Sequence, residues 1–297
     1  DQGKPNPFNF GVIGSSDTHV AGGSYTEETH FSKIGLLDGE PYLRGSVPFD
    51  GIYGFLVKLW QPDSMIEIDE KNYLSFSSRL IRFGSSGLAG VWAEENTRES
   101  IYNAFRRKET FGTSGPRIKV RFFAGYNFEN SNLYDSNLIQ EAYSKNTPMG
   151  GDLIKEKDKN PKFLVWAISD PLGAPLERIQ IIKGWLAEGE QMEKVFDVAC
   201  SDGQSVNSQT HRCPNNNAQV NLDDCSISSD KGDAEIKTFW QEPGFDNGQE
   251  AFYYARGPEN PTCRWSTWDA VRAEESPRSD IPVTIQERAW SSPIWYK

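Results

Sequence analysis

The chain has 297 residues, enough for one large domain or two moderate ones with a substantial core. Nine Trp, eleven Tyr and seventeen Phe, with charged residues at 25 %, indicate an ordered globular protein and exclude a disordered one. The formal net charge of −11 and the lack of a basic stripe argue against a nucleic-acid-binding protein, because a phosphate backbone requires a basic surface.

The first predicted element is a buried strand over residues 10–13, which ends in Gly14 and two serines. Asp17 and His19 follow, and because they are two residues apart they would project from the strand's end on the same side. A carboxylate and an imidazole so placed suggest two ligands of a metal ion, with Ser16 available to contact them or the substrate. In the alternative interpretation, Asp17 caps the following turn and His19 forms a hydrogen bond with it.

The stretch after this motif is less regular. His30 follows two glutamates and a threonine, and no spacing pattern positions it as a ligand, so we expect a surface histidine. Residues 35–87 mix Gly, Pro and Ser with short apolar pieces. This texture predicts an insertion of irregular structure, which either covers the site or contacts a second subunit.

A strand and a helix are predicted after the insertion. Residues 90–95 suit a short strand, and Asn96 or Thr97 would cap a helix that ends in basic residues. A strand followed by a helix is the unit from which β/α barrels are built. Glu94 and Glu95 would lie at the carboxyl end of the strand, where such barrels keep their chemistry. They would either contact the metal ligands or only support the start of the helix.

The turn at residues 113–117 allows two interpretations. The hydroxyl of Ser114 and the guanidinium of Arg117 are groups that bind an oxyanion. The Gly-Pro dipeptide between them is also ordinary turn chemistry at a domain boundary. The sequence does not choose between the two.

Beyond residue 117 the sequence alternates apolar and polar residues without a long helical period. This pattern predicts a sandwich-like, β-rich domain over residues 118–297, with its aromatic C-terminal tail packed back on the body. The predicted strands are residues 118–122, 162–168, 178–182, 194–198, 235–239 and 251–256.

The cysteines bear on the compartment. Cys200, Cys213, Cys225 and Cys263 form no C-x-x-C pair, which argues against a zinc site. Their even number and polar surroundings predict two disulfides, and therefore a periplasmic or secreted protein; the alternative is buried free thiols. Of the three possible pairings we favour Cys213 with Cys225 and Cys200 with Cys263, since these would close the polar loop and tie its base. No run approaches the roughly 18 apolar residues of a membrane span.

Several motifs resemble those of known families. Gly14-Ser-Ser-Asp-Thr-His19 is similar to the last metal-ligand motif of the PHP (polymerase and histidinol phosphatase) superfamily, and nearly the whole chain resembles the PHP-related DUF3604 family. The other stretches that carry the resemblance are residues 88–101, 107–117, 264–272 and 285–296. The resemblance implies an α/β plus β protein. Residues 1–117 would form the C-terminal part of a distorted PHP-type (β/α)7 barrel, followed by the β-sandwich-like domain.

The resemblance also implies a chemistry. PHP sites hold two or three divalent ions, so Asp17 and His19 would bind Mn, Zn or Fe, and a metal-activated water would hydrolyse a small anionic ester, first of all a phosphate. Two alternatives stay open. The chain could hydrolyse another ester such as a sulfate, or it could be a non-catalytic β-rich module that grips carbohydrate or a partner with its aromatic side chains.

The chain departs from the PHP pattern in its histidines. PHP sites draw most ligands from an early H-x-H pair, whereas this chain has three histidines, His19, His30 and His211, and no H-x-H. It also begins directly on the predicted strand without an initiator methionine. We therefore expect a missing N-terminal segment, or another chain, to supply the other ligands and complete the barrel. Residues 1–297 alone are then expected to be inactive on phosphate esters.

Overall fold

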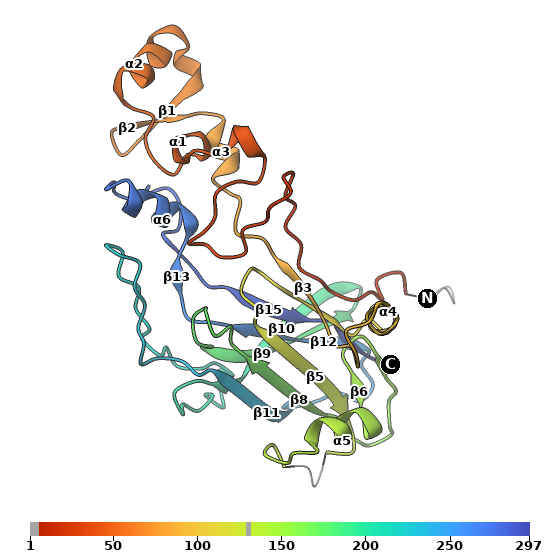
Figure 1. Cartoon of the computed structure of the whole chain (residues 1–297). Helices are drawn as coiled ribbons and strands as arrows, with labels where there is room; N and C mark the ends of the chain where they lie inside the picture. Colours follow the sequence, from red (N-terminus) through yellow and green to blue (C-terminus); the bar gives the residue numbers. More distant parts are fainter. Residues whose placement is uncertain (1–5, 129–131) are drawn as a thin grey trace.

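The computed structural model describes residues 6–128 and 132–297, which fold mainly as β-strands in two packed sheets (Figure 1). The larger sheet has eight strands. They are β3 (Leu88–Val91), β4 (Thr110–Thr113), β7 (Asp152–Leu153), β9 (Arg178–Ala187), β10 (Glu190–Cys200), β12 (Ala251–Pro258), β15 (Arg288–Ser291) and β16 (Ile294–Tyr296). Their order is β10–β9–β12–β15–β4–β3, with β16 paired to β12 and β7 paired to β16.

The smaller sheet consists of β5 (Lys119–Gly125), β6 (Thr147–Pro148), β8 (Lys162–Ile168) and β11 (Glu235–Gln241), in the order β11–β8–β5–β6. Its inner face packs against the larger sheet, and residues of both sheets share one hydrophobic core. The rings of Phe163 in β8 and Tyr253 in β12 lie 4.7 Å apart in this core. Helix α5 (Leu138–Lys145) covers the outer face, where Leu138 packs with Phe123 and Leu164.

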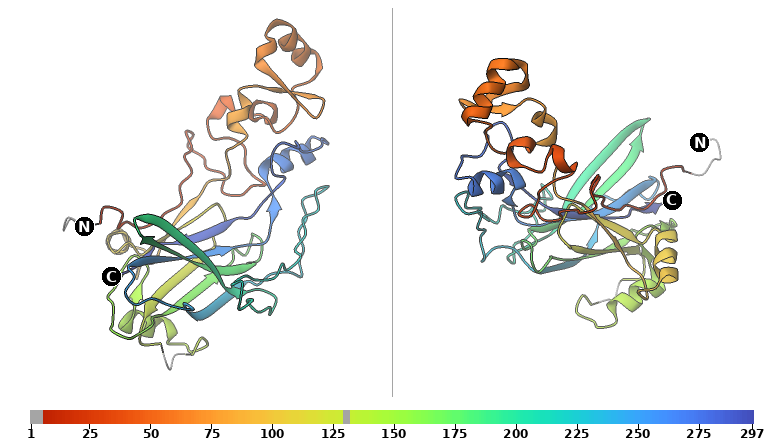
Figure 2. Two further views of the ribbon diagram at one scale, coloured as in Figure 1. Left: turned by 180° about the vertical axis from the view of Figure 1, so that it is seen from behind. Right: turned by 45° about the horizontal axis from the view of Figure 1, so that its top comes forward.

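Residues 35–80 project from the sheets as a lobe of short elements (Figure 1, Figure 2). These are η1 (Gly35–Leu37), α1 (Pro41–Arg44), α2 (Gly51–Trp60), η2 (Pro62–Ser64), β1 (Met65–Ile68), β2 (Lys71–Leu74) and α3 (Ser77–Leu80). Helix α6 (Trp265–Arg272), with the short strands β13 (Thr262–Cys263) and β14 (Thr284–Ile285), lies between the lobe and the sheets. The predicted irregular insertion is therefore made largely of regular elements.

A buried ion pair fixes the lobe to α6. The Nε atom of Arg44 lies 2.6 Å from Oδ2 of Asp269, and its Nη2 atom donates to Oδ1 at 2.7 Å. Both side chains are buried, and Ser46 donates a further hydrogen bond to the same carboxylate. Bidentate geometry and full hydrogen bonding are the conditions under which a buried pair avoids a net desolvation cost.

The predicted (β/α)7 barrel is wrong. Helix α4 (Arg98–Arg106) does follow β3, and Thr97 caps it by accepting a hydrogen bond from the Ser100 amide. However, the next strand, β4, returns antiparallel to β3, and its other edge pairs with β15. The one parallel pair among the described strands is β7 with β16, so these strands close no parallel barrel. The strand-then-helix pattern was misleading because it does not show in which direction the next strand runs.

The strands predicted beyond residue 117 are present. They correspond to β5, β8, β9, β10, β11 and β12, although β9 and β10 extend further and form a long antiparallel hairpin. The aromatic tail also packs on the body, since Tyr296 of β16 is buried in the core. Within the described ranges, no helix has both the length and the apolar character needed to cross a bilayer.

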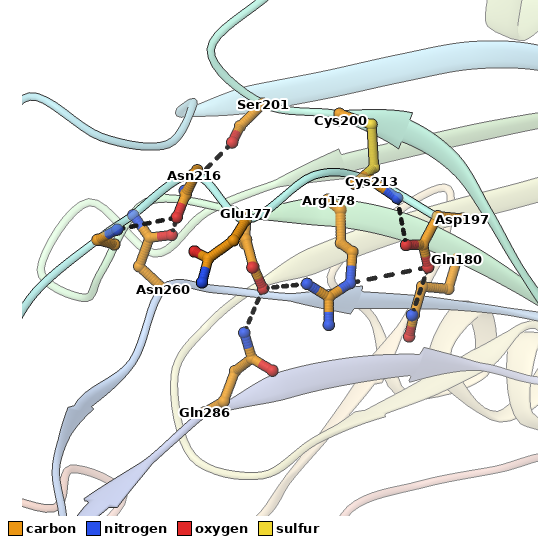
Figure 3. A network of polar contacts seen from close by, with 12 residues as sticks. Glu177, Arg178, Gln180, Asp197, Cys200, Ser201, Cys213, Asn216, Asn260 and Gln286 are labelled. Carbon is orange, nitrogen blue, oxygen red and sulfur yellow. Dashed lines mark hydrogen bonds and ion pairs between the residues drawn. A yellow bond between two sulfur atoms is a disulfide. The ribbon is translucent and has the colours of Figure 1, made fainter. Parts of the chain in front are cut away.

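Two disulfides are present, as predicted, but the favoured pairing is wrong. Cys200 is joined to Cys213, and Cys225 is joined to Cys263. The reason is that the chain folds back on the end of β10, where Asp197 accepts a hydrogen bond from the Cys213 amide at 2.7 Å. Cys213 is thereby placed beside Cys200 (Figure 3).

Polar contacts hold the rest of the long segment between β10 and β11 (Figure 3). The side chain of Asn216 donates to Oδ1 of Asn260 at 2.8 Å and to Oγ of Ser201 at 3.4 Å. Asn216 and Asn260 are both buried. The segment therefore depends on side-chain hydrogen bonds and disulfides, because it contributes few apolar side chains to the core.

We expect the two disulfides to differ in their contribution to stability. Cys225–Cys263 closes a loop of sequence separation 38 and Cys200–Cys213 one of 13. Loop-closure entropy then predicts losses of about 4 and about 3 kcal/mol in the free energy of unfolding for the paired Cys→Ser variants. Denaturant titration of the two double variants measures this difference. Peptide mapping without reductant that found Cys213 linked to Cys225 would contradict the pairing.

Candidate functional site

The segment that carries the predicted metal ligands is not a strand. Residues 10–18 have no regular secondary structure, and the segment lies against β3 and β4, where the amide of Gly14 donates to the Leu88 carbonyl at 3.1 Å. A Cβ on Gly14 would lie 2.4 Å from that carbonyl oxygen, and one on Gly112 in β4 would lie 2.5 Å from the Gly14 nitrogen. Glycine at both positions therefore lets the segment sit directly on the sheet.

Asp17 and His19 follow this contact as two exposed side chains. Asp17 has a left-handed backbone with φ 49°, and the amide of His19 donates to the Lys33 carbonyl at 2.8 Å. Within the described chain, neither the carboxylate nor the imidazole forms a hydrogen bond or an ion pair. Ser16 directs its hydroxyl elsewhere, accepting from the Thr18 amide at 3.2 Å. Both predicted ligands are thus free to bind a group from solution.

A buried lysine lies beneath this loop. Lys33 is 7 % exposed, and its Nζ atom donates to the Ser16 carbonyl at 2.7 Å and to Oγ of Ser86 at 3.2 Å. Burial lowers the pKa of Lys33, and the nearby charges of Asp17, Glu27 and Asp38 oppose this shift. The loop with Asp17 therefore rests on a positive charge, which the sequence did not single out.

The residues present satisfy only part of a metal site. Carboxylate and imidazole are suitable donors for Mn, Zn or Fe, and both are exposed. Among the residues that the structure describes, however, no group of three or more His, Cys, Asp or Glu side chains could hold an ion. His30 does not add to the set. It is buried and stacks on Trp265 with ring centroids 4.6 Å apart, and burial lowers its pKa to about 4, so the prediction of a surface histidine is wrong.

The other predicted site residues lie in two different places. Glu94 and Glu95 are exposed and follow the Val91 end of β3, whereas Gly14 contacts the Leu88 end. The structure therefore does not bring these two glutamates to Asp17. Ser114 and Arg117 lie in the turn after β4.

That turn borders a cavity of about 290 Å³, which we call the carboxylate pocket. It is lined by the buried acidic side chains of Glu27, Asp170, Glu259 and Glu287, together with Arg117. Register in the larger sheet brings two of these acids together. Pro258 of β12 is paired with Arg288 of β15. Glu259 follows Pro258 and Glu287 precedes Arg288, so the antiparallel pairing makes the two glutamates neighbours. The Glu259 amide donates to the Glu287 carbonyl at 3.0 Å.

The acids of the carboxylate pocket differ in their hydrogen bonds. Glu27 accepts from the amides of Ser85 and Trp265, at 2.8 and 2.7 Å, through its two oxygens. Asp170 likewise accepts from two backbone amides, one of them that of Arg117 at 2.8 Å.

The two glutamates at the strand ends are less satisfied. The Oε2 atoms of Glu259 and Glu287 are buried and have no hydrogen-bond partner. Their side chains are 1 % and 3 % exposed. Because both residues line the cavity, a group that enters it is a candidate donor for these oxygens.

Burial and like charges raise the pKa values of both glutamates. For Glu259, desolvation is the largest cause, followed by the charges of Glu287 and Asp170, and the pKa rises to about 9. For Glu287, desolvation and then the charge of Glu27 raise the pKa to about 7, against hydrogen bonds from Ser114 and Ser85. Glu259 is therefore protonated at neutral pH.

No pattern in the sequence indicated this pocket. Its acids come from segments far apart in the chain, each glutamate or aspartate being unremarkable in its local context. Only the antiparallel pairing of β12 with β15 makes Glu259 and Glu287 neighbours.

Comparison with known proteins gives one match. A family model described as "Protein of unknown function (DUF3604)" matches residues 1–297. No curated protein matches the chain, and no solved structure matches it. The arguments about function therefore rest on the side chains described above.

The Gly14→Ala variant tests how the ligand segment is held. A methyl group at this position would clash with the carbonyls of Leu88 and Thr113, so we expect the segment to move off β3 and β4 at a cost of about 1–3 kcal/mol. Faster amide hydrogen exchange at residues 11–19 would report this movement. Gly84→Ala is the control, because a Cβ at Gly84 meets nothing within 4 Å. Equal exchange in both variants would contradict the close-packing argument.

The Glu259→Gln variant tests the raised pKa. The pKa of Glu259 is about 9 in the folded state and 4.5 in its ordinary state. Between pH 4.5 and pH 9, Glu259 therefore carries a proton in the folded protein that it loses on unfolding. The group's contribution to stability is therefore complete below pH 4.5 and is lost as the pH rises towards 9. Denaturant titration at pH 5 and pH 8 should show a fall on the order of 4 kcal/mol in the native protein and a smaller fall in Glu259→Gln. The exposed Glu190→Gln is the control; an undiminished fall in Glu259→Gln would mean that Glu259 ionises normally.

Proposed function

The chain belongs to the DUF3604 family of proteins of unknown function, and we propose that it contributes two ligands to the metal centre of a hydrolase. The observation that carries this proposal is the pair Asp17 and His19, which are exposed and make no side-chain hydrogen bond or ion pair within the described residues. The similarity of Gly14-Ser-Ser-Asp-Thr-His19 to the last PHP ligand motif supports it.

The remaining ligands must come from outside the described residues. A hydrolytic ion is usually held by three or more protein ligands and keeps one open position. Asp17 and His19 supply two, and no third acidic, histidine or cysteine side chain joins them in the described part of the chain. We propose that residues upstream of this chain, or a second chain, supply the rest. The bound ion, Mn, Zn or Fe, would activate a water and polarise the ester.

The chain's own residues prepare the ligands. Close packing of Gly14 on Gly112 sets where the loop begins, and the hydrogen bond from the His19 amide to the Lys33 carbonyl sets where it ends. The buried ammonium of Lys33 donates a hydrogen bond to the Ser16 carbonyl at 2.7 Å and so holds the backbone just before Asp17. The loop is thus positioned before any ion arrives.

The substrate we propose is a small anionic ester, a phosphate ahead of a sulfate. With a net charge of −11, the chain itself would repel such an ester, so the metal ions would have to supply the local positive charge. The two disulfides support a periplasmic or secreted location, because such bonds persist in oxidising compartments.

A second candidate function, a binding module, is favoured by an aromatic groove on the larger sheet. This groove has a volume of about 430 Å³. It is lined mainly by Phe8, Phe10, Phe252, Tyr254, Trp290 and Trp295. Aromatic faces of this kind bind the apolar faces of sugars or of a protein partner. Retained metal with ester turnover supports the first candidate, whereas sugar binding without metal supports this one.

The Asp17→Asn variant tests the metal ligand. In a protein that includes the remaining ligands, losing one anionic ligand should weaken Mn²⁺ or Zn²⁺ binding by about tenfold or more while the fold is kept, because Asp17 is exposed. Metal content after dialysis measures this effect. Asp63→Asn removes an exposed carboxylate in the distant lobe and is the control. Equal metal content in the native protein and Asp17→Asn would remove Asp17 from the site.

The same proposal predicts that residues 1–297 alone are inactive. A chromogenic phosphate ester with added Mn²⁺ or Zn²⁺ should be hydrolysed by a protein that includes the upstream residues and not by residues 1–297. Robust turnover by residues 1–297 would show that they complete the site without further ligands.

A further inference from the structure

The carboxylate pocket lacks positive charge. Its acids, Glu27, Asp170, Glu259 and Glu287, form no ion pair within the described residues. The one cation that lines the cavity, Arg117, is exposed, and its guanidinium stacks 4.8 Å from the Tyr25 ring and donates to the Tyr25 hydroxyl. Buried carboxylates are normally paired, so the pocket lacks a partner that proteins usually provide.

The unpaired groups face the cavity. Glu259 and Glu287 both line it, and each has a buried Oε2 atom without a hydrogen-bond donor. Glu27 and Asp170 are already satisfied by backbone amides. The open hydrogen-bonding capacity of the pocket therefore belongs to these two oxygens, whose residues are backbone neighbours, and a ligand that fits the ionised carboxylates must donate hydrogen bonds.

The chemistry of the pocket favours an organic donor over a metal ion. In the described chain no three acidic, histidine or cysteine side chains converge closely enough to hold an ion. The lining also includes the apolar or aromatic side chains of Tyr25, Leu172, Ile227 and Trp268. A small cavity lined by both carboxylates and apolar side chains suits a compact molecule with a charged end.

We propose that the carboxylate pocket binds a small organic cation whose ammonium or guanidinium group donates hydrogen bonds to Glu259 and Glu287. This site is separate from the Asp17 and His19 pair and does not depend on the proposed hydrolase activity. An ammonium group offers three donors and a guanidinium five, enough for both orphan oxygens. The apolar part of the ligand would contact Tyr25 and Trp268.

Binding of a cation is coupled to proton release. In the free protein the neighbouring acids Glu287 and Asp170 favour protonated Glu259, and Glu27 raises the pKa of Glu287 while Arg288 lowers it. Arg117 and Glu28 also line the cavity. A bound cation favours the ionised carboxylates and expels the proton, so affinity should rise as the pH rises.

The probes for this proposal are benzylamine and its neutral and anionic analogues, benzyl alcohol and benzoate, with Ca²⁺ as a metal control. At pH 8, benzylamine should bind purified residues 1–297 about tenfold or more tightly than benzyl alcohol, and benzoate should not bind. The affinity for benzylamine should rise from pH 6 to pH 8. Calorimetry in buffers of different ionisation enthalpy should show proton release.

Matched variants separate this site from unspecific binding. Glu259→Gln and Glu287→Gln should each weaken benzylamine binding by about tenfold, and Glu259→Gln should abolish most of the proton release. Glu259→Gln replaces a protonated acid with a neutral amide and Glu287→Gln removes a buried carboxylate, so both variants are expected to remain folded, which the denaturant midpoint checks. Glu190→Gln should bind as the native protein does.

Four outcomes would overturn the proposal. Benzyl alcohol that binds as well as benzylamine would show that charge is not recognised. Ca²⁺ that binds and displaces benzylamine would make the pocket a metal site. No detectable binding of benzylamine at about 10 mM, or binding that both glutamine variants keep, would mean that the two carboxylates simply share a proton.

Discussion

The two-sided pairing of β15 is the interaction on which the rest of this structure depends. This strand joins β12 on one edge and β4 on the other, both antiparallel, and so connects the β3–β4 pair to the main body of the larger sheet. Its Ala289 is fully buried in the common core. Among the described strands, β15 is the one that pairs the β3–β4 pair with the rest of the larger sheet.

Both candidate sites follow from this strand. Just before it, Glu287 meets Glu259 and forms the centre of the carboxylate pocket. Just after it, Ser292 accepts a hydrogen bond from the Val12 amide at 2.8 Å and helps to seat the segment that leads to Asp17. The ends of one short strand thus position two groups of ionisable side chains with different surroundings.

The two groups differ in how far folding removes their charged side chains from water. Asp17 and His19 are exposed and unpaired, so their side chains remain hydrated in the free protein. Strong binding of an ion there needs further ligands. Glu259 and Glu287 are already desolvated by folding, and the cost appears as raised pKa values. A cation that enters the carboxylate pocket would relieve that cost, which is why a small organic ion is sufficient there.

The sequence by itself determined the β-rich body, the strands after residue 117 and the presence of two disulfides, because these depend on alternation and residue type that local chain chemistry fixes. It also predicted a helix cap at Asn96 or Thr97, and the structure has the cap at Thr97. Tertiary structure alone decided the rest. The direction in which β4 returns excluded the barrel, the fold-back beside β10 chose the disulfide partners, and stacking on Trp265 buried His30. Tertiary structure also decided the carboxylate pocket, because strand register makes Glu259 and Glu287 neighbours. Register depends on how two chain segments pair and cannot be read from either segment alone.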